Sequence, residues 1–558
     1  MTPRRSPDVP WHRWERRLRV LVLAAVPVCA ASVMHGQVLF ERIARSAEEP
    51  QNWLTYSGGL MGQRFSRLAA VTPTNVKNLE LQWVFQSRSL EKFEATPLVV
   101  NGTMYTVQPP NDVVALDAST GRVFWVYQYA PSPLARPCCG RVNRGLAILG
   151  DSLFMATIDG HVIALDAKNG GLVWNAVLAK PEAGYSFTVA PLVINDVVIV
   201  GVAGAEYGVR GFLSALDART GQERWRFFTI AGEGDPGRTS WAGDSWKTGG
   251  GSVWVTGSYD ADLNLTYWGI GNPGPDWNGD ERQGDNLYTD SVVALDARTG
   301  ALKWYFQFTP HDVFDYDSVQ VPVLADITWR GRPRKVLLLA NRNGFFYVLD
   351  RTTGEFLLGK PFVKTTWTTG LDEKGRPMKV LELGADGTLA FPGVQGGTNW
   401  FSPSYSPGTG LFYIPSWVDT YATFTKRPVE YREGQRFTGA LPAMSVRLLT
   451  PGPLVNRRLP EEGHGAIQAF DPETGDKKWE FAMTDVTDSG VLTTASGLLF
   501  SGGREGYFFA LDARTGALLW KASLGGQVSN GPITYAVGGR QFVAVVGGNA
   551  LFSYALRQ

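Results

Sequence analysis

The sequence lacks an excess of charge of either sign, and it lacks a long apolar run. Its 53 basic and 52 acidic residues give a formal charge of +1 over 558 residues. Capture of nucleic acid needs a basic face, so this balance argues against a nucleic-acid partner. The apolar stretch Val20–Val33 has 14 residues, whereas a bilayer-spanning helix needs about 20.

This short apolar stretch follows a basic segment and predicts a secretory signal. Six arginines precede it, and the small residues Val28-Cys29-Ala30 lie near its end, an order typical of signal peptides. We therefore expect residues 1–33 to be a signal peptide, with an uncleaved membrane anchor as the alternative, and residues 34–50 to be a linker. Export would place the protein in the periplasm, without stable membrane insertion once the signal is cleaved.

Cysteine is scarce, with three residues in the chain. Cys29 lies in the expected signal, so cleavage would leave Cys138 and Cys139. An even count of cysteines suits an oxidising compartment.

Helix-favouring runs are few, whereas 64 Gly, 19 Trp, 19 Tyr and 29 Phe indicate many short strands and turns. The chain also repeats itself. The phrase Ala-x-Asp-x-x-Thr-Gly-x-x-x-Trp, or a close variant, occurs seven times, and we call it the tag. The seven tags contain Asp117 with Trp125, Asp166 with Trp174, Asp217 with Trp225, Asp296 with Trp304, Asp350 without a Trp, Asp471 with Trp479, and Asp512 with Trp520.

Each tag predicts a strand, a tight turn and a second strand that carries the Trp. The spacings of 49 and 51 residues between Asp117, Asp166 and Asp217 fit one four-stranded blade each, which favours a β-propeller. An eighth, untagged blade is expected between Asp350 and Asp471, around residues 397–414. We therefore predict an all-β, eight-bladed β-propeller with tryptophan-tagged blades over residues 51–558. A β-solenoid fits poorly because the inserts between tags are long and irregular.

The stretch Thr309–Ser318 places Asp312, Asp315 and Asp317 within six residues, with aromatic residues between them. A polar turn between strands is the simplest interpretation. In an extended stretch, however, side chains at i and i+2 point the same way. The carboxylates of Asp315 and Asp317 could therefore face one metal ion.

From about Trp53 to the C-terminus, the tags and the motifs between them resemble the pyrroloquinoline quinone (PQQ) dependent alcohol dehydrogenases, the methanol and ethanol dehydrogenase family. The sequence Cys138-Cys139-Gly-Arg-Val-Asn-Arg144-Gly is similar to the family's C-C-x-x-V-N-R-G. In that family a ring formed by the two cysteines covers one face of the quinone. The resemblance thus implies a Cys138–Cys139 disulfide, and two free or separately packed thiols are the alternative.

The resemblance implies further contacts with PQQ along the chain. Arg144 would pair with a PQQ carboxylate, a task suited to a guanidinium. Trp254 would stack on the other quinone face, and Arg342 would lie against the quinone oxygens. The remaining expected contacts are Glu94, Thr188, Ala203, Gly204, Ala205, Ser252 and Asn399. Ala203 stands where relatives often have Ser, which puts one side-chain contact in doubt.

The same resemblance implies a metal site made of Glu206, Asn272 and Asp315, with Asp317 as a further ligand. Ca²⁺ takes about 6–8 oxygen ligands, but three carboxylates crowded around a divalent ion repel one another. The Asp-Tyr-Asp form resembles the family's lanthanide-dependent branch, so we expect La³⁺ or Ce³⁺, with Ca²⁺ as the alternative. Asp276 is an extra residue relative to the family's G-x-G-N-P-x-P-W-N.

The implied activity is oxidation of a small alcohol to an aldehyde, with Asp315 as the base and PQQ as the hydride acceptor. The sequence has no C-x-x-C-H haem motif, so the expected electron acceptor is a separate periplasmic c-type cytochrome. A homodimer is left open. The alternatives are a PQQ-dependent sugar or polyol dehydrogenase and a non-catalytic propeller scaffold. The scaffold has no reason to keep these motifs together.

Overall fold

The computed structural model describes residues 38–445 and 460–557. The expected signal at residues 1–33 lies outside the described residues. Within them, no helix is both long and apolar enough to cross a membrane. Part of the expected linker is ordered, because α1 (Phe40–Ala44) buries Ile43 in the core and Val38 pairs with Gly150.

Among the described residues, eight sheets contain four or five strands. Within each of these sheets the four main strands are antiparallel neighbours, and the short β1 (Phe65–Ser66) adds to one sheet in parallel. The sheets are formed by β3 (Leu98–Val100), β4 (Thr103–Gln108), β5 (Asp112–Asp117) and β6 (Val123–Tyr127); β7 (Ala147–Leu149), β8 (Ser152–Ala156), β9 (His161–Asp166) and β10 (Leu172–Val177); β11 (Leu192–Ile194), β12 (Val197–Gly201), β13 (Phe212–Asp217) and β14 (Glu223–Phe228); β15 (Ser258–Asp260), β16 (Leu265–Gly269), β17 (Ser291–Asp296) and β18 (Leu302–Gln307); β19 (Val323–Trp329), β20 (Arg332–Ala340), β21 (Phe345–Asp350) and β22 (Phe356–Pro361); β26 (Ser404–Ser406), β27 (Leu411–Val418), β30 (His464–Phe470) and β31 (Lys477–Ala482); β32 (Leu492–Thr494), β33 (Leu498–Gly502), β34 (Tyr507–Asp512) and β35 (Leu518–Ser523); and β36 (Ile533–Val537), β37 (Arg540–Gly547), β38 (Ala550–Leu556) and β2 (Leu79–Gln86).

The tags join neighbouring sheets through their tryptophans. The Trp125 indole donates to the carbonyl of Ala167 in the next tag, at 3.3 Å. A Cβ on Gly170 of that tag would lie 2.7 Å from the Trp125 ring, and Gly170 has a φ of 75°, so the turn requires glycine. The same contact joins Trp83 to Gly121, Trp174 to Gly221, Trp225 to Gly300, Trp304 to Gly354, and Trp479 to Gly516. The tag therefore forms a hairpin within one blade and also packs against the neighbouring blade.

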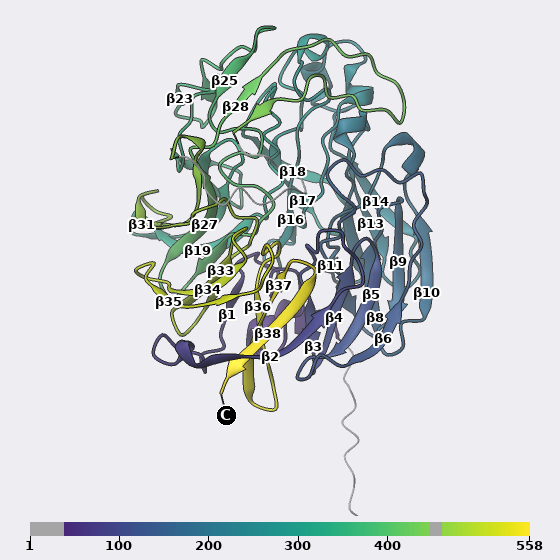
Figure 1. Cartoon of the computed structure of the whole chain (residues 1–558). Helices are drawn as coiled ribbons and strands as arrows, with labels where there is room; N and C mark the ends of the chain where they lie inside the picture. Colours follow the sequence, from purple (N-terminus) through teal and green to yellow (C-terminus); the bar gives the residue numbers. More distant parts are fainter. Residues whose placement is uncertain (1–37, 446–459, 558) are drawn as a thin grey trace, which may run out of the picture. The chain divides into compact units, whose positions relative to one another are not determined.

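The all-β propeller is confirmed, but the expected position of the untagged blade is wrong. Strand β27, which covers the end of residues 397–414, pairs with β30 and belongs to the tagged sheet of Asp471. The untagged sheet consists of β36, β37, β38 and the N-terminal strand β2. This sheet closes the ring because β2 and β38 pair from opposite ends of the chain (Figure 1).

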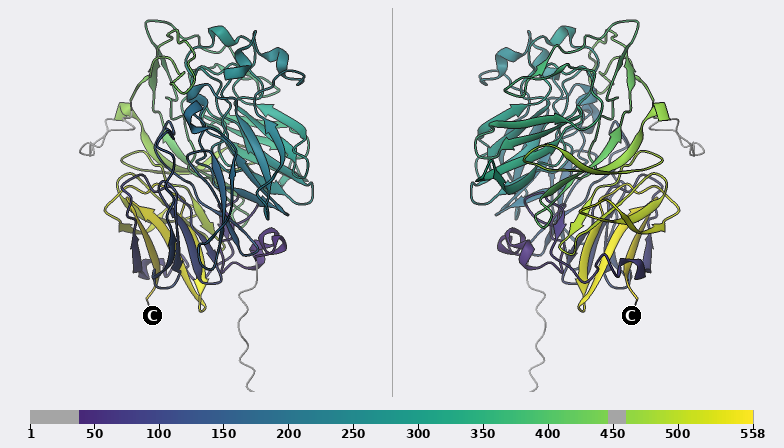
Figure 2. Two further views of the ribbon diagram at one scale, coloured as in Figure 1. Left: turned by 90° about the vertical axis from the view of Figure 1, so that its right-hand side faces the viewer. Right: turned by 90° about the vertical axis from the view of Figure 1, so that its left-hand side faces the viewer.

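The residues between β22 and β30 carry the main insertion. It contains a two-stranded sheet of β23 (Gly370–Leu371) and β24 (Pro377–Met378), and a three-stranded sheet of β25 (Thr388–Ala390), β28 (Ala422–Phe424) and β29 (Ala443–Met444). Both further views show these green segments gathered with the short teal helices at the upper edge (Figure 2). Hydrogen bonds from this insertion reach the site described next.

Candidate active site

The expected site residues lie just before the first strand or just after the second strand of successive sheets. Because those two strands are antiparallel, both positions lie at the same end of the sheet. They are Glu94 before β3, Arg144 before β7, Thr188 before β11, Glu206 after β12, Trp254 before β15, Asn272 after β16, Asp315 and Asp317 before β19, Arg342 after β20, and Asn399 before β26. The sheets thus bring residues far apart in sequence to one face.

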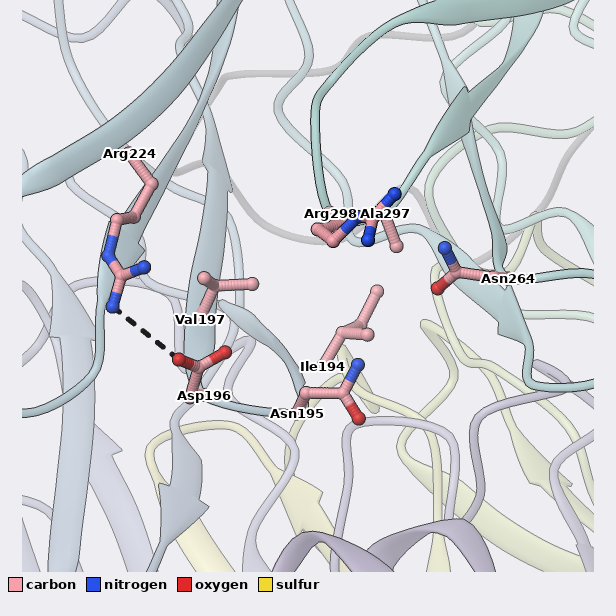
Figure 3. Close-up of a pocket in the computed structure, with 8 residues that line it drawn as sticks. All are labelled: Ile194, Asn195, Asp196, Val197, Arg224, Asn264, Ala297 and Arg298. Atoms are coloured by element: carbon pink, nitrogen blue, oxygen red, sulfur yellow. Dashed lines mark hydrogen bonds and ion pairs between the residues drawn. The ribbon is translucent and has the colours of Figure 1, made fainter.

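A cavity of about 370 Å³ lies elsewhere (Figure 3). It is lined by the turn between β11 and β12 and by Asn264 and Ala297, with Arg224 paired to Asp196 at 3.5 Å. These turns follow the first or the third strand of their sheets, whereas the expected site residues precede the first strand or follow the second. The cavity therefore lies at the opposite end of the sheets from the expected site. We therefore do not assign it to the chemistry.

Asp315 and Asp317 are held together by one buried guanidinium. Arg342 places Nη2 3.0 Å from Asp315 Oδ2 and Nη1 2.6 Å from Asp317 Oδ2, and its Nε donates to the Val394 carbonyl at 2.7 Å. The Asp315 side chain is 17% exposed, whereas those of Asp317 and Arg342 are 7% and 5% exposed. Asp315 is therefore the acid of this pair that solvent and a substrate can reach.

The aromatic residues of this stretch fix where its carboxylates point. Phe314 and Tyr316 are fully buried and stack at 5.3 Å. The Asp312 carboxylate accepts the N–H groups of Phe314 and Tyr316 at 2.9 and 2.8 Å. The expectation of a simply extended stretch is wrong at two residues, since His311 has a φ of 53° and Asp315 a φ of 62°. The two carboxylates nevertheless face the same partner.

Asp317 is anchored from three loops. Its Oδ1 accepts the backbone N–H of Asn272 at 2.8 Å, and its Oδ2 accepts the Trp254 indole N–H at 3.2 Å as well as Arg342. Nearby, the Ser252 hydroxyl accepts the N–H of Ala205 at 2.9 Å. That bond fixes the turn that presents Glu206.

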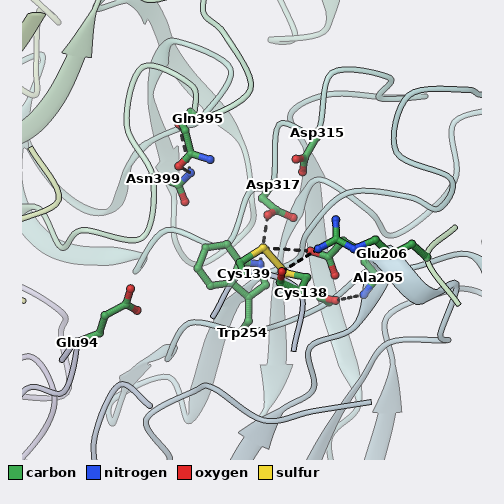
Figure 4. The surroundings of a disulfide bond; sticks show 12 residues. Glu94, Cys138, Cys139, Ala205, Glu206, Trp254, Asp315, Asp317, Gln395 and Asn399 are labelled. Carbon is green, nitrogen blue, oxygen red and sulfur yellow. Dashed lines mark hydrogen bonds between the residues drawn. A yellow bond between two sulfur atoms is a disulfide. The ribbon is translucent and has the colours of Figure 1, made fainter. Parts of the chain in front are cut away.

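Cys138 and Cys139 form a disulfide with a Cα–Cα distance of 3.8 Å, as the family resemblance implied. Cys139 Sγ lies 3.9 Å from Glu206 Oε1 (Figure 4). From the insertion, Arg436 donates to the Cys138 carbonyl at 3.0 Å, and the Phe437 N–H donates to the Glu206 carbonyl at 2.7 Å. The insertion therefore packs directly against the disulfide and Glu206.

Arg144 lies between two indole rings. Its guanidinium is 4.7 Å from the centroid of Trp254 and 5.2 Å from that of Trp400, and it pairs with Glu94 at 2.9 Å. The Thr188 carbonyl accepts the Arg144 backbone N–H at 3.1 Å. The structure thus brings Glu94, Arg144, Thr188 and Trp254 together.

The other expected contacts make local bonds. Ala203 bridges Ser186 through two backbone hydrogen bonds of 2.8 and 3.1 Å. A Cβ on Gly204 would lie 2.4 Å from the Gly184 carbonyl, so the neighbouring loop by itself requires glycine there. Asn399 is buried, and its amide donates to the carbonyl and side chain of Gln395 at 3.2 Å.

Sequence reasoning missed a buried ion network beside Glu94. Lys92 Nζ lies 3.3 Å from Glu94 and 3.0 Å from Asp488, and Arg504 pairs with Asp488 at 3.2 Å. Burial would raise the pKa of Asp488, but the charges of Arg504 and Lys92 outweigh it and lower that pKa to about 2. Lys92 and Asp488 are 396 residues apart, so no local pattern links them.

Burial is the main influence on the acids of the site, and their mutual repulsion adds to it. Burial, followed by the charges of Asp317, Asp276 and Glu206, raises the pKa of Asp315 well above its ordinary value, against the opposing charge of Arg342. Burial and the charge of Asp317 raise the pKa of Glu206 to about 7. Four carboxylates therefore act on one another here, and Asp276 is one that the motifs had not assigned.

Comparison with known proteins gives the same picture. Residues 53–362, more than half of the chain, match the family described as glucose/ethanol/alcohol dehydrogenase, β-propeller domain. Residues 463–554 match the family of the outer membrane protein assembly factor BamB. The quinoprotein alcohol dehydrogenase PedH of Pseudomonas putida is 37% identical over 560 residues, covering 95% of this chain and 91% of that protein.

A lanthanide-dependent methanol dehydrogenase of Methylacidiphilum fumariolicum is 35% identical, covering 91% of this chain and 86% of the relative. A solved europium-containing methanol dehydrogenase superposes with a TM-score of 0.86 at 32% identity, covering 92% of this chain and all of that one. Fold and sequence together define a β-propeller quinoprotein. The chain belongs to the family of PQQ-dependent alcohol dehydrogenases. It is an enzyme of that family, so the scaffold alternative is set aside.

The described residues fit the family's cofactors, PQQ and a metal ion. Arg144 Nε is buried, has no hydrogen-bond acceptor in the protein and lies beside the Trp254 ring. An anionic planar ligand would accept this N–H and stack on the ring. The ligand atoms of Cys138, Cys139 and Glu206 all lie within 4.8 Å of one another, but disulfide sulfurs are not thiolates. The hard oxygens of the acid group are the donors that suit a hard cation.

Proposed function

We propose that the enzyme oxidises a small primary alcohol to an aldehyde, with Asp315 as the base. The observation that carries this proposal is the Asp315 side chain, which is 17% exposed and is held in place by its ion pair with the buried Arg342. A general base must come within hydrogen-bond reach of the proton it removes. Asp315 and Asp317 both pair with Arg342, and Asp315 is the more exposed of the two.

When bound, PQQ would supply the hydride acceptor, and the metal ion would supply the Lewis acid that makes the quinone a better acceptor. Asp315 takes the hydroxyl proton. Arg342 lowers the cost of a charged Asp315 in a buried site, since its charge opposes the effect of burial on the Asp315 pKa. Trp254 and the Cys138–Cys139 disulfide are the surfaces that would enclose the quinone.

For the metal we propose a light lanthanide such as La³⁺ or Ce³⁺. Glu206, Asp315 and Asp317 supply three carboxylates, and each carboxylate raises the cost of charging its neighbours. Three carboxylates around one ion repel one another, and a trivalent ion offsets this repulsion more strongly than Ca²⁺ does. Two relatives are named for lanthanide chemistry, a lanthanide-dependent and a europium-containing methanol dehydrogenase.

Reconstitution of the metal-free protein tests this choice. Protein loaded with PQQ and either La³⁺ or Ca²⁺ is assayed on alcohols, polyols and sugars with an artificial electron acceptor. We expect La³⁺ to support turnover of primary alcohols and Asp317→Ala to abolish the La³⁺-dependent rate. Full activity with Ca²⁺ alone, unchanged in Asp317→Ala, would rule the lanthanide out, and preference for sugars would support the sugar dehydrogenase alternative.

We further propose that the enzyme works in the periplasm with a c-type cytochrome as electron acceptor. The basic and apolar N-terminal segment supports export, and the absence of a haem motif from this sequence calls for a separate acceptor. Fractionation of the native host and stopped-flow reduction of purified periplasmic cytochromes test the two parts. Activity confined to the cytosol would contradict the proposed location.

A further inference from the structure

Lys92 is an extra cation in the ion network beside Glu94. Glu94 already pairs with the buried Arg144 at 2.9 Å. Asp488 already accepts Nη2 of Arg504 on both of its carboxylate oxygens, each at 3.2 Å. Lys92 Nζ lies 3.3 Å from Glu94 and 3.0 Å from Asp488. Lys92 therefore adds a third positive charge to two acids that are each paired with a guanidinium.

Lys92 is also the member of this network that solvent reaches most. Its side chain is 37% exposed, whereas the side chains of Glu94 and Asp488 are 5% and 4% exposed. An ammonium group has three N–H donors, and within residues 38–445 and 460–557 these two acids are its ion-pair partners. A surface lysine moves freely on its flexible stem, but this one is held from two buried acids. It is a fixed cation with a donor left for an acceptor from outside the chain.

The position of Lys92 is next to the expected cofactor contacts. Lys92 Nζ is 4.9 Å from the centroid of Trp400, and the Arg144 guanidinium is 5.2 Å from the same centroid. Arg144 also lies 4.7 Å from the centroid of Trp254, the ring that would stack on the quinone. The two cations thus share one indole ring and one carboxylate, that of Glu94.

We propose that Lys92 binds a carboxylate of PQQ, as a second cation beside Arg144. Hydrogen bonds between an ammonium group and a carboxylate are among the strong ones, and the free donor of Lys92 lacks such a partner in the protein. Glu94, which joins the two cations, and Glu206 lie on opposite sides of Trp254 (Figure 4). The inference therefore rests on PQQ as the cofactor, and not on the choice of metal ion or base.

Titration with PQQ tests the inference without measuring turnover. Wild-type protein, Lys92→Met and the matched control Lys335→Met receive PQQ in the presence of excess Ca²⁺ or La³⁺, and quenching of tryptophan fluorescence reports binding. Lys335 is 34% exposed and pairs with Asp262 at 2.9 Å, near the start of β20 and at the opposite end of its sheet from the site. We expect Lys92→Met to weaken PQQ binding about 10–100-fold, the effect of one hydrogen bond to a charged group. The control should match the wild type.

Acetylation of lysines in the wild-type protein gives a second measurement that needs no variant. Lys92 and Lys335 are similarly exposed, so an amine-reactive reagent should label both in the PQQ-free protein. With PQQ at about ten times its Kd, labelling of Lys92 should slow about tenfold, because only the unbound fraction reacts. Mass spectrometry of the peptides measures both rates, and the rate at Lys335 should not change.

The thermal midpoint of the PQQ-free proteins separates binding from a structural role. Glu94 and Asp488 keep their guanidinium partners when Lys92 is replaced, so Lys92→Met should leave that midpoint close to the wild-type value and should reduce the increase caused by PQQ. Unchanged PQQ affinity in Lys92→Met, unchanged labelling of Lys92 with PQQ bound, or a large fall in the midpoint would overturn the inference. Failure of the wild-type protein to bind PQQ with either ion would instead contradict the cofactor.

Discussion

Replacement of Asp315 by Asn is the sharpest test of the proposed base, because it keeps the shape and removes the charge. Arg342 keeps its bonds to Asp317 and to the Val394 carbonyl, and the Asn oxygen can still accept its Nη2. Burial and the neighbouring acids raise the pKa of Asp315 well above its ordinary value, so the folded protein holds the charged form at a cost. The neutral Asn should therefore leave the unfolding free energy of the protein without metal unchanged or higher. Turnover should fall about 10²–10⁴-fold, the usual contribution of a general base.

The assay is steady-state dye reduction by the PQQ- and metal-loaded enzyme, with a thermal melt of the same sample. Asp260→Asn is the matched control, since Asp260 is a buried acid 2.7 Å from Arg351 at the opposite end of its sheet. The control should lose stability while keeping its turnover. The Asp315→Asn protein must be folded and loaded with PQQ and metal in this assay. If its rate of alcohol oxidation is then within about tenfold of the wild-type rate, Asp315 is not the base.

Three further outcomes follow from the structure. Cys138→Ser should slow dye reduction without shifting the thermal midpoint, because a bridge between neighbours closes almost no loop; a large shift would make the pair structural. Trp225→Ala should cost about 3–5 kcal/mol of unfolding free energy in denaturant, because this 9% exposed ring packs on Gly300 of the next sheet. Asp488, whose pKa is lowered to about 2 beside Arg504, stabilises the fold above its unfolded pKa of about 3.9. That stability, about 2–3 kcal/mol, is lost as pH falls toward 2. Asp488→Asn should remove this part of the acid dependence, and an unchanged acid limb would contradict it.

The tagged sheets could be predicted because each tag carries its own local chemistry. The Asp117 carboxylate accepts the N–H groups of Ser119 and Thr120 at 2.8 and 3.2 Å, and the turn glycine that follows receives a ring from the neighbouring sheet. The closing sheet has no such phrase. It pairs β2 with β38, two strands at opposite ends of the chain, and pairing at that separation leaves no local pattern to read.

The acid pair of the site could be predicted for a similar reason, since Asp315 and Asp317 lie two residues apart. What the sequence could not supply is the set of partners that fixes them. Asp317 accepts hydrogen bonds from Trp254 before β15, from Asn272 after β16 and from Arg342 after β20. These donors come from two sheets, and Val394 in the insertion adds a fourth anchor through Arg342.

These anchors bear on catalysis as well as on folding. A base contributes most when its position is set before the substrate arrives, because reorganisation then costs nothing during the reaction. Asp315 meets this condition through Arg342, whose other two bonds go to Asp317 and Val394. Phe314 and Tyr316 flank Asp315 in the sequence, and their buried, stacked rings hold this stretch in one orientation. The propeller therefore acts on the chemistry by fixing the direction of one carboxylate from several sheets at once.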